Sequence, residues 1–225
     1  MIYITGDTHI PVDIQKLGMS NFKEQKNMNK NDYVIISGDF GGVWNNSKEE
    51  LYWRKWLREK NFTTLFVDGN HENFDLLNQY EVKEWNGGKV HFINDSIIHL
   101  MRGQIYTIEG NKIFVMGGAT SIDKSFRTEG VSWWKEEIPS CTEVAEALNN
   151  LEKNNWKVDY VITHTTSNEI MKKMEYMKEC NALNIFFDFL QVNLNYKHWF
   201  FGHFHDDKDI DDKHTLVYER IIKLN

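Results

Sequence analysis

The sequence contains little cysteine and little proline, and it has no long apolar run. Only two cysteines, Cys141 and Cys180, occur in 225 residues, far apart and without a CxxC pair. This usage excludes a dense disulfide framework and is typical of free thiols in a reducing compartment. No segment approaches the roughly 18 apolar residues of a membrane span. The first residues lack the basic and apolar regions of a signal peptide, so we expect a cytoplasmic protein with no membrane partner.

Positive charge is also scarce. The chain has 26 Lys and Arg against 33 Asp and Glu, which gives a net charge of −7. Because a nucleic-acid backbone attracts basic surfaces, this balance argues against nucleic acid as the main partner, although a local basic patch stays open. No linker rich in Pro, Gly or Ser interrupts the chain. With 41% apolar residues available for a core, we predict one domain over residues 1–225.

What the chain does have is a series of short apolar runs that each end in a polar, glycine-containing turn. Such runs are typical of strands buried on both faces; they lie at residues 33–42, 63–72, 112–121, 158–167 and 197–205. Capping signals at Ser47 and Ser140 predict helices between some of them. Residues 82–116 alternate apolar runs with short turns, which predicts a meander. We therefore expect two packed sheets with helices outside.

Side chains that can bind metals gather where these runs end. Five of the nine histidines stand there with two aspartates and one asparagine, namely Asp7, His9, Asp39, Asn70, His71, His164, His203 and His205. Because ligands collect at the strand ends of open α/β sheets, we expect these side chains to meet. Carboxylate, imidazole and amide groups without thiolate suit Mn²⁺, Fe²⁺ or Zn²⁺, and a carboxylate can bridge two ions roughly 3.5–4 Å apart. The pattern predicts a two-metal hydrolytic site.

Five short blocks resemble, in the same order, the signature of the calcineurin-like metallophosphoesterase superfamily. They are GDTH at residues 6–9, GDFG at 38–41, GNHE at 69–72, the lone His164, and GHFH at 202–205. The likeness is to a bacterial or phage member of the Ser/Thr-phosphatase type. It implies an α+β (α/β) fold, a four-layer α/β/β/α sandwich of two mixed β-sheets flanked by helices, in agreement with the two-sheet outline.

The resemblance also implies a role for each matched residue. Asp7, His9 and His205 would hold one divalent metal, Asn70, His164 and His203 a second, and Asp39 would bridge the two. A hydroxide that bridges the metals would attack phosphorus, and His71 would be the general acid that protonates the leaving oxygen. Two Mn²⁺ ions are expected, with Fe²⁺ or Zn²⁺ as alternatives.

The second block departs from that of the protein Ser/Thr phosphatases. Those enzymes carry an Asp that supports the catalytic His and an Arg that binds phosphate, where this chain has Gly42 and Val43. His71 must therefore find another partner, and another cation must neutralise the phosphoryl oxygens. Only five arginines occur, and two of them, Arg54 and Arg58, fall on a helix face that we expect to be solvated.

Arg127 and Arg102 are the candidates for the phosphate site. Arg127 belongs to a loop at residues 117–134 that directly follows a buried-looking strand. One interpretation makes this loop a wall of the substrate cleft with Arg127 on the phosphate. The other makes it a packed surface loop in which Trp133 and Trp134 cap the core. Arg102 is the second candidate and is expected at a hairpin tip.

Three functions stay open. The first is hydrolysis of phosphate monoesters on a small molecule or a protein, including the activity of a phosphoprotein phosphatase. The second is a phosphodiesterase that acts on cyclic nucleotides, dinucleotides or nucleic-acid ends. The third is a non-catalytic metal-binding scaffold, which the retention of every ligand and of His71 disfavours.

Overall fold

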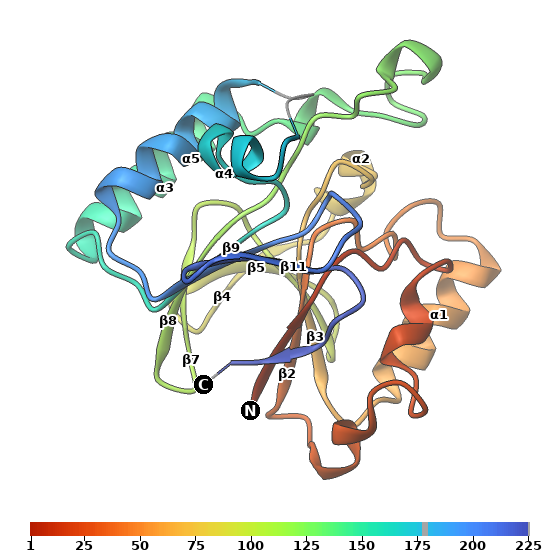
Figure 1. Cartoon of the computed structure of the whole chain (residues 1–225). Helices are drawn as coiled ribbons and strands as arrows, with labels where there is room; N and C mark the ends of the chain where they lie inside the picture. Colours follow the sequence, from red (N-terminus) through yellow and green to blue (C-terminus); the bar gives the residue numbers. More distant parts are fainter. Residues whose placement is uncertain (177–179, 225) are drawn as a thin grey trace.

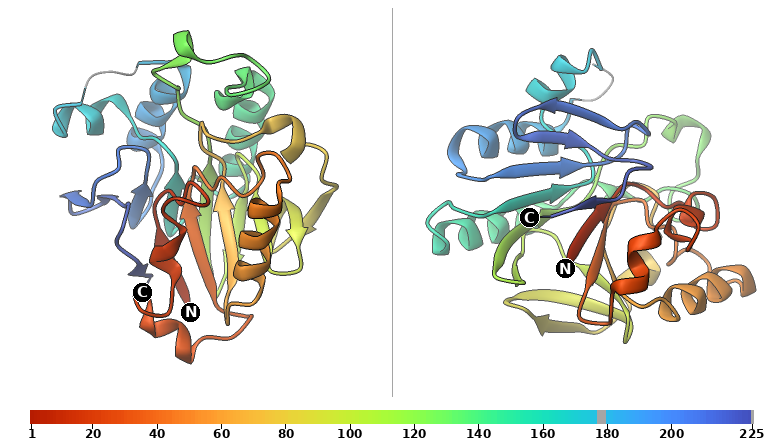
Figure 2. Two further views of the ribbon diagram at one scale, coloured as in Figure 1. Left: turned by 90° about the vertical axis from the view of Figure 1, so that its right-hand side faces the viewer. Right: turned by 60° about the horizontal axis from the view of Figure 1, so that its bottom comes forward.

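The computed structural model describes residues 1–176 and 180–224. In this part of the chain two β-sheets lie face to face, and helices cover the outer face of each sheet (Figure 1). The same layers are seen from the side and from below in Figure 2. The predicted fold, two mixed sheets with flanking helices, is confirmed.

The first sheet has seven strands. Their order is β13 (Ile222–Lys223), β1 (Ile2–Thr5), β2 (Tyr33–Ser37), β3 (Thr63–Val67), β6 (Ile97–Leu100), β5 (Gly88–Asn94) and β4 (Val82–Trp85). The four strands from β1 to β6 run parallel, and the antiparallel pairs lie at the two edges. The strands β1, β2 and β3 therefore deliver the segments that follow them to the same end of the sheet.

The second sheet has six strands. Their order is β11 (Lys208–Asp211), β12 (His214–Leu216), β10 (His198–Phe201), β9 (Tyr160–Thr163), β8 (Asn111–Met116) and β7 (Ile105–Ile108). The four central strands run parallel, with an antiparallel strand at each edge. The segments that follow β9 and β10 leave this sheet at its carboxyl end, as those of the first sheet do.

Helices cover both sheets on the outside. The helix α1 (Lys48–Arg58) and the 3₁₀ turns η1 (Ile14–Leu17) and η2 (Lys23–Asn27) lie over the first sheet, whereas α3 (Cys141–Lys153), α4 (Asn168–Lys173) and α5 (Ala182–Asn193) lie over the second (Figure 1). The short elements α2 (Phe74–Leu77), η3 (Lys124–Phe126) and η4 (Lys135–Glu137) belong to loops. Ser47 and Ser140 are the N-caps of α1 and α3, as their spacing predicts.

The apolar runs are continuous because both faces of these strands are covered. In β2, Ile35 belongs to the core between the sheets, whereas its neighbours Val34 and Ile36 belong to the core under α1. In β9, Ile162 faces the first core and Val161 faces the helices of the second layer. Successive side chains of a strand point to opposite faces, so a strand between two cores needs apolar residues at every position.

The expected meander is divided between the two sheets. β6 belongs to the first sheet and the next strand, β7, to the second, so residues 101–104 form a crossing between sheets instead of a hairpin tip. Gly103 has φ +71, and an added Cβ would lie 2.9 Å from the Ala147 side chain of α3. Glycine is therefore required where the chain passes under this helix. The hairpin prediction fails here because sequence periodicity does not say which sheet a strand joins.

The expectation that Arg54 lies on a solvated face is wrong. Arg54 is buried on α1, where it donates to the Gly42 carbonyl and forms an ion pair with Glu50. Glu50 also accepts hydrogen bonds from the backbone N–H groups of three successive residues, 44 to 46. The pair therefore fixes the loop between β2 and α1 to the helix. Arg58 is exposed, as predicted, and pairs with Asp95.

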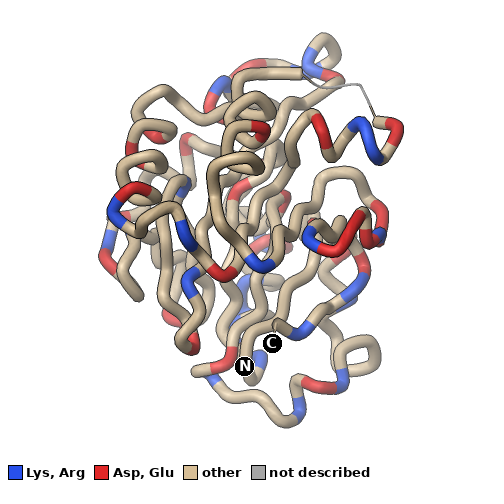
Figure 3. The backbone as a smooth tube through the Cα atoms, turned by 60° about the vertical axis from the view of Figure 1, so that its left-hand side comes forward, with Lys and Arg blue, Asp and Glu red and all other residues tan. Residues whose placement is uncertain are grey.

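Charged residues of both signs are interspersed along the chain on the side of the molecule seen in Figure 3. Several of them form surface ion pairs, such as Lys89 with Glu146 and Lys197 with Asp159. Among the described residues, no helix has the length and apolar character needed to cross a bilayer.

A buried histidine pair should make the fold sensitive to acid. The Nδ1 atoms of His91 and His99 lie 3.1 Å apart, and His99 Nε2 lies 3.1 Å from Asp68 Oδ1. Burial, and then the neighbouring His99, lowers the pKa of His91 from 6.5 to about 4. Between these pH values the unfolded chain binds a proton at His91 and the folded chain does not, so stability falls as the pH decreases. We expect His91 to remove about 2 kcal/mol from the free energy of unfolding between pH 7 and pH 5.

Urea unfolding of the metal-free protein across this pH range measures the effect. The matched variant is His91→Asn, because the Asn amide does not titrate and can still donate to His99. Its free energy of unfolding should have a smaller slope between pH 7 and pH 5 than that of the wild type. Two parallel curves would contradict the prediction.

Candidate metal centre

The segments that leave β1, β2, β3, β9 and β10 bring all the expected metal ligands into one place. Three groups of side chains there offer ligand atoms that lie within 4.8 Å of one another. They are Asp7, His9 and His205; His9, Asp39 and His71; and Asp39, His164 and His203. Because the groups share His9 and Asp39, they form one continuous centre.

The first ligand set consists of Asp7, His9 and His205. Asp7 is fully buried, and its Oδ2 lies 3.2 Å from His205 Nε2. Its Oδ1 accepts a hydrogen bond of 3.1 Å from the backbone N–H of His203. The Asp7 carboxylate therefore joins the loop after β1 to the loop after β10.

Asp39 lies between this set and the second one. Its Oδ2 is 3.2 Å from His9 Nε2, whereas its Oδ1 is 3.3 Å from His164 Nε2. His164 Nε2 also lies 3.1 Å from Asn70 Oδ1, which places Asn70 in the second set. One carboxylate oxygen faces each set, as a bridging ligand requires.

Two glycines of the signature blocks allow this close approach. A Cβ at Gly69 would lie 2.0 Å from Asp39 Oδ1, and one at Gly202 would lie 2.3 Å from Asp7 Oδ1. Any side chain at these positions would displace the carboxylates. The backbone is also unusual at four ligands, since φ is positive at His9, Asp39, His203 and His205. Strained backbone of this kind gathers at functional sites, where the surrounding fold holds it in place.

The electrostatics of the centre favour bound cations. Burial is the largest influence and raises the pKa of the Asp7 and Asp39 carboxyls, but the charge of His164 and the contacts with the other histidines together outweigh it, so both pKa values are lowered. Burial in turn lowers the pKa of His164, yet the two carboxylates raise it to about 10. The buried carboxylates therefore attract positive charge strongly at this point.

The donor set fits two divalent cations. Asp7 Oδ2 is buried and has no hydrogen-bond partner among the described residues, although His205 Nε2 lies near it. A buried acceptor without a donor is costly unless a cation binds it. Imidazole nitrogens, carboxylate oxygens and one amide oxygen are ligands of Mn²⁺, Fe²⁺ and Zn²⁺. Asp7, His9 and His205 would hold one ion, Asn70, His164 and His203 the other, and Asp39 both.

Comparison with known proteins supports this interpretation. The family model of the calcineurin-like phosphoesterases matches residues 1–207. The chain belongs to the calcineurin-like phosphoesterase family. No curated protein matches the chain. The match extends from β1 to the loop after β10 and so includes every residue of the candidate centre.

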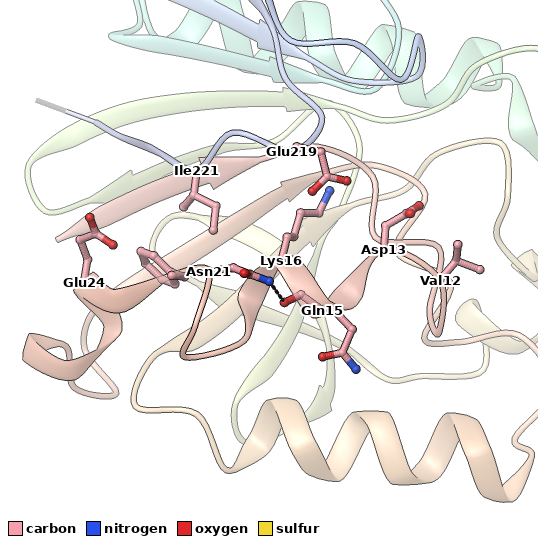
Figure 4. A pocket seen from close by; sticks show the side chains of 9 residues that line it. Val12, Asp13, Gln15, Lys16, Asn21, Glu24, Glu219 and Ile221 are labelled. Atoms are coloured by element: carbon pink, nitrogen blue, oxygen red, sulfur yellow. Dashed lines mark hydrogen bonds between the residues drawn. The ribbon is translucent and has the colours of Figure 1, made fainter.

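Three residues that the sequence did not single out support the first ligand set of this phosphoesterase. Asp13 Oδ2 lies 2.7 Å from His9 Nδ1, and the Tyr218 ring stacks on the His205 ring with centroids 4.9 Å apart. The buried Lys16 Nζ donates to the backbone carbonyls of Asp7 and Tyr218, each at 2.6 Å. Asp13 and Lys16 also line a neighbouring cavity of about 360 Å³, where the ammonium end of Lys16 lies beside Glu219 (Figure 4).

Asp13 should set the affinity of the first ligand set. A carboxylate that accepts the second N–H of a ligand histidine fixes its tautomer and orientation, and its loss commonly weakens metal binding about 10–100-fold. We expect Asp13→Asn to weaken one of two Mn²⁺ sites by this factor and to leave the other unchanged, as measured by titration calorimetry. Asp159→Asn, which removes a carboxylate paired with Lys197, is the control. Unchanged affinity at both sites in Asp13→Asn would contradict the prediction.

His71 lies beside the centre and contacts Arg127. The backbone N–H of His71 donates to Asp39 Oδ1 at 2.8 Å. Arg127 Nη1 lies 3.1 Å from His71 Nδ1, and its Nη2 lies 3.5 Å from Nε2. A guanidinium only donates, so at the shorter of the two contacts Nδ1 is the acceptor, and the proton of the neutral ring is then on Nε2. Burial, and also the Arg127 charge, lowers the pKa of His71.

Arg127 is held firmly in the wall of the phosphoesterase cleft. Its Nε donates to Asp123 at 2.7 Å, and its Nη1 also donates to the Ser132 carbonyl at 2.9 Å. Arg127 and His71 line a cavity of about 290 Å³ with the candidate metal ligands Asp39, Asn70, His203 and His205. Of the two interpretations of the loop at residues 117–134, the structure favours the cleft wall, while Trp134 is also buried in the core.

Arg102 lies elsewhere. It is buried, and its Nε donates to Asp68 Oδ2 at 2.7 Å. It lines a different cavity, of about 270 Å³, with His91 and His99. Because the chain crosses between sheets at Arg102, the side chain turns inward and neutralises a buried carboxylate. The structure therefore does not bring Arg102 to the metal centre.

The departure from the protein phosphatases at Gly42 has a steric cause. A Cβ at Gly42 would lie 2.4 Å from the ring of Phe40, which is fully buried. An Asp therefore cannot stand there without displacing Phe40. The backbone N–H of Phe40 is held by the buried Glu72 carboxylate at 2.7 Å. The GNHE block thus fixes the GDFG block through Glu72, a residue that the sequence analysis did not single out.

Proposed function

We propose that this phosphoesterase hydrolyses phosphate monoesters at a centre of two divalent metal ions, with Mn²⁺ as the expected metal. The observation that carries the proposal is the position of Arg127, which lies in the same cavity wall as the ligands of both sets. A monoester keeps a phosphoryl group with up to two negative charges, so it requires a cation beyond the metal ions. Arg127 supplies this charge.

The side chains divide the work in the following way. Two divalent cations, when bound, would polarise the phosphoryl group and make a water molecule nucleophilic near neutral pH. Arg127 binds and orients the phosphoryl oxygens through Nη2, because both N–H groups of Nη1 already face His71 Nδ1 and the Ser132 carbonyl. His71 donates a proton to the leaving oxygen from its imidazolium form and so returns to the neutral ring; in the imidazolium Nδ1 also carries a proton and no longer accepts from Arg127 Nη1. Asp123 keeps Arg127 in position through the bond to its Nε.

The phosphodiesterase alternative is favoured by one observation. A second cavity, of about 190 Å³, adjoins the His71–Arg127 pair and includes Trp44. A diester has two groups attached to phosphorus, and the two cavities could each take one of them.

The substrate in the first proposal is a phosphorylated small molecule or protein in the cytoplasm, where free thiols such as the exposed Cys141 and Cys180 persist.

Hydrolysis of phenyl phosphate and of diphenyl phosphate tests the proposal. The protein is stripped of metal, Mn²⁺ is restored, and His71→Asn is assayed beside the wild type. We expect Mn²⁺-dependent turnover of the monoester, reduced about 100-fold or more in His71→Asn. Preferential turnover of the diester would overturn the proposal in favour of the phosphodiesterase. No turnover of either ester with two bound Mn²⁺ would overturn it in favour of the scaffold.

A further inference from the structure

A small cavity lined by Trp44 adjoins the catalytic groups. Its volume is about 190 Å³, and its lining residues are His9, Ile10, Gly41, Trp44, His71 and Arg127. It shares His71 and Arg127 with the larger cavity that contains the metal ligands Asp39, Asn70 and His203. The two cavities therefore meet at the residue that protonates the leaving oxygen in the proposed reaction.

The walls of this cavity are mainly apolar and carry no carboxylate. Ile10, Gly41 and Trp44 form the side away from His71. Gly41 has φ +72, and a Cβ there would lie 2.6 Å from the Ile10 backbone nitrogen, so no side chain can narrow the cavity at this point. A charged or strongly hydrated group placed against this side of the cavity would lose its water without finding a side-chain partner.

The Trp44 indole is fixed before any substrate arrives. It packs edge to face on Trp134, with ring centroids 5.3 Å apart and an interplanar angle of 84°. Trp134 is buried and its Nε1 donates to Asp75 at 2.8 Å. The Trp44 backbone is held at both ends, since its N–H donates to Glu50 and its carbonyl accepts from Asn73. A rigid aromatic wall binds a planar ring at little cost in conformational entropy.

We propose that the Trp44 cavity binds the leaving group of the substrate and that this group is an aryl ring bonded directly to the ester oxygen, as in a phosphorylated tyrosine side chain. The proposal rests on the monoesterase function. With the phosphoryl group beside Arg127, the ester oxygen faces His71, and the group beyond that oxygen enters the Trp44 cavity. There the ring packs against the indole and Ile10.

The size of the cavity is compatible with this class of leaving group. The Trp44 cavity is open to solvent, and its volume of about 190 Å³ accommodates one ring with a short substituent; an enclosed apolar cavity of about 150 Å³ holds benzene. A nucleoside places a sugar between the phosphate and its base. The sugar would occupy the cavity and leave the base outside the contact with Trp44.

Trp44→Leu and Trp44→Phe test the proposal with phosphotyrosine, phosphoserine and adenosine monophosphate as substrates. We expect Trp44→Leu to lower kcat/KM for phosphotyrosine about tenfold relative to phosphoserine, and Trp44→Phe to retain most of the preference because it keeps a ring. Inhibition separates binding from chemistry. The inhibition constant of phenylphosphonate should rise about tenfold in Trp44→Leu, whereas that of methylphosphonate should not change. Trp53→Leu is the control, because Trp53 lies on α1 and its ring packs against the ring of Trp56 on the same helix.

The failure of this inference can be distinguished from failure of the proposed function. Equal loss for phosphotyrosine and phosphoserine in Trp44→Leu, or no loss for either, would overturn the aryl subsite while monoester hydrolysis stands. A loss confined to adenosine monophosphate would overturn it in favour of a nucleoside. Absence of monoester turnover in the wild type would overturn the function itself, and unchanged phenylphosphonate binding in Trp44→Leu would then overturn the subsite separately. The Mn²⁺ content of each variant confirms that the centre is intact.

Discussion

We expect Asp39→Asn to lower the Mn²⁺-dependent rate of monoester hydrolysis by on the order of 10³-fold or more. Each Asp39 oxygen faces a different ligand set, at 3.2 Å from His9 Nε2 and 3.3 Å from His164 Nε2. Asn keeps the shape of the side chain but replaces one of these acceptors with a donor and removes the charge. One set therefore loses its shared ligand.

Metal content identifies the cause of this loss. The variant should bind fewer than two Mn²⁺ ions per chain after dialysis, as measured by elemental analysis, whereas the wild type should bind two. Asp159→Asn, which removes a surface carboxylate, should behave as the wild type in both measurements. If Asp39→Asn keeps two ions and the wild-type rate, Asp39 is not the bridging ligand.

Arg127→Ala should lower kcat/KM by about 10²–10³-fold without any loss of metal. The guanidinium contacts both nitrogens of the His71 ring and is held by Asp123, so its removal takes a charge from the phosphoryl site and a partner from His71. Arg127→Lys keeps the charge but cannot contact both nitrogens in the same plane, so it should recover only part of the activity.

The control for Arg127 is Arg58→Ala, because Arg58 is exposed and pairs only with Asp95 at the surface among the described residues. Its kcat/KM should match that of the wild type. Steady-state kinetics and the Mn²⁺ content are measured on all three variants. An Arg127→Ala enzyme with wild-type kcat/KM would exclude Arg127 from the phosphate site, and a loss of metal would show that Arg127 supports the centre instead.

The gathering of the candidate metal ligands could be read from the sequence because their positions depend on local rules. Asp39 and Asn70 each follow an apolar run that can only be a buried strand, and parallel strands present their carboxyl ends together. The glycine directly before each of these two residues indicates that its backbone lies close to another group; the backbone of Gly69, for example, lies against the Asp39 carboxylate. The apolar run and the glycine both lie within a few residues of the side chain whose position they predict.

The supporting contacts could not be read in the same way. Tyr218 meets His205 through a loop that Asp207 holds by accepting N–H groups of residues 218 to 220, and no periodicity predicts such a loop. Asp13 stands four residues from His9, but this spacing carries meaning only in a helix, and the segment between them is a turn. Arg102 was misplaced because its direction depends on which sheet the next strand joins.

The two ligand sets also determine when the centre can form during synthesis. Asp7 and His9 are made with β1, whereas His203 and His205 come after β10, about 200 residues later. At about 5–20 residues per second, roughly 10–40 s separate the first ligand from the last. Each set takes one of these two late histidines. A chain that stops before residue 203 therefore lacks a candidate ligand to both ions, and capture of both metals requires synthesis through residue 205.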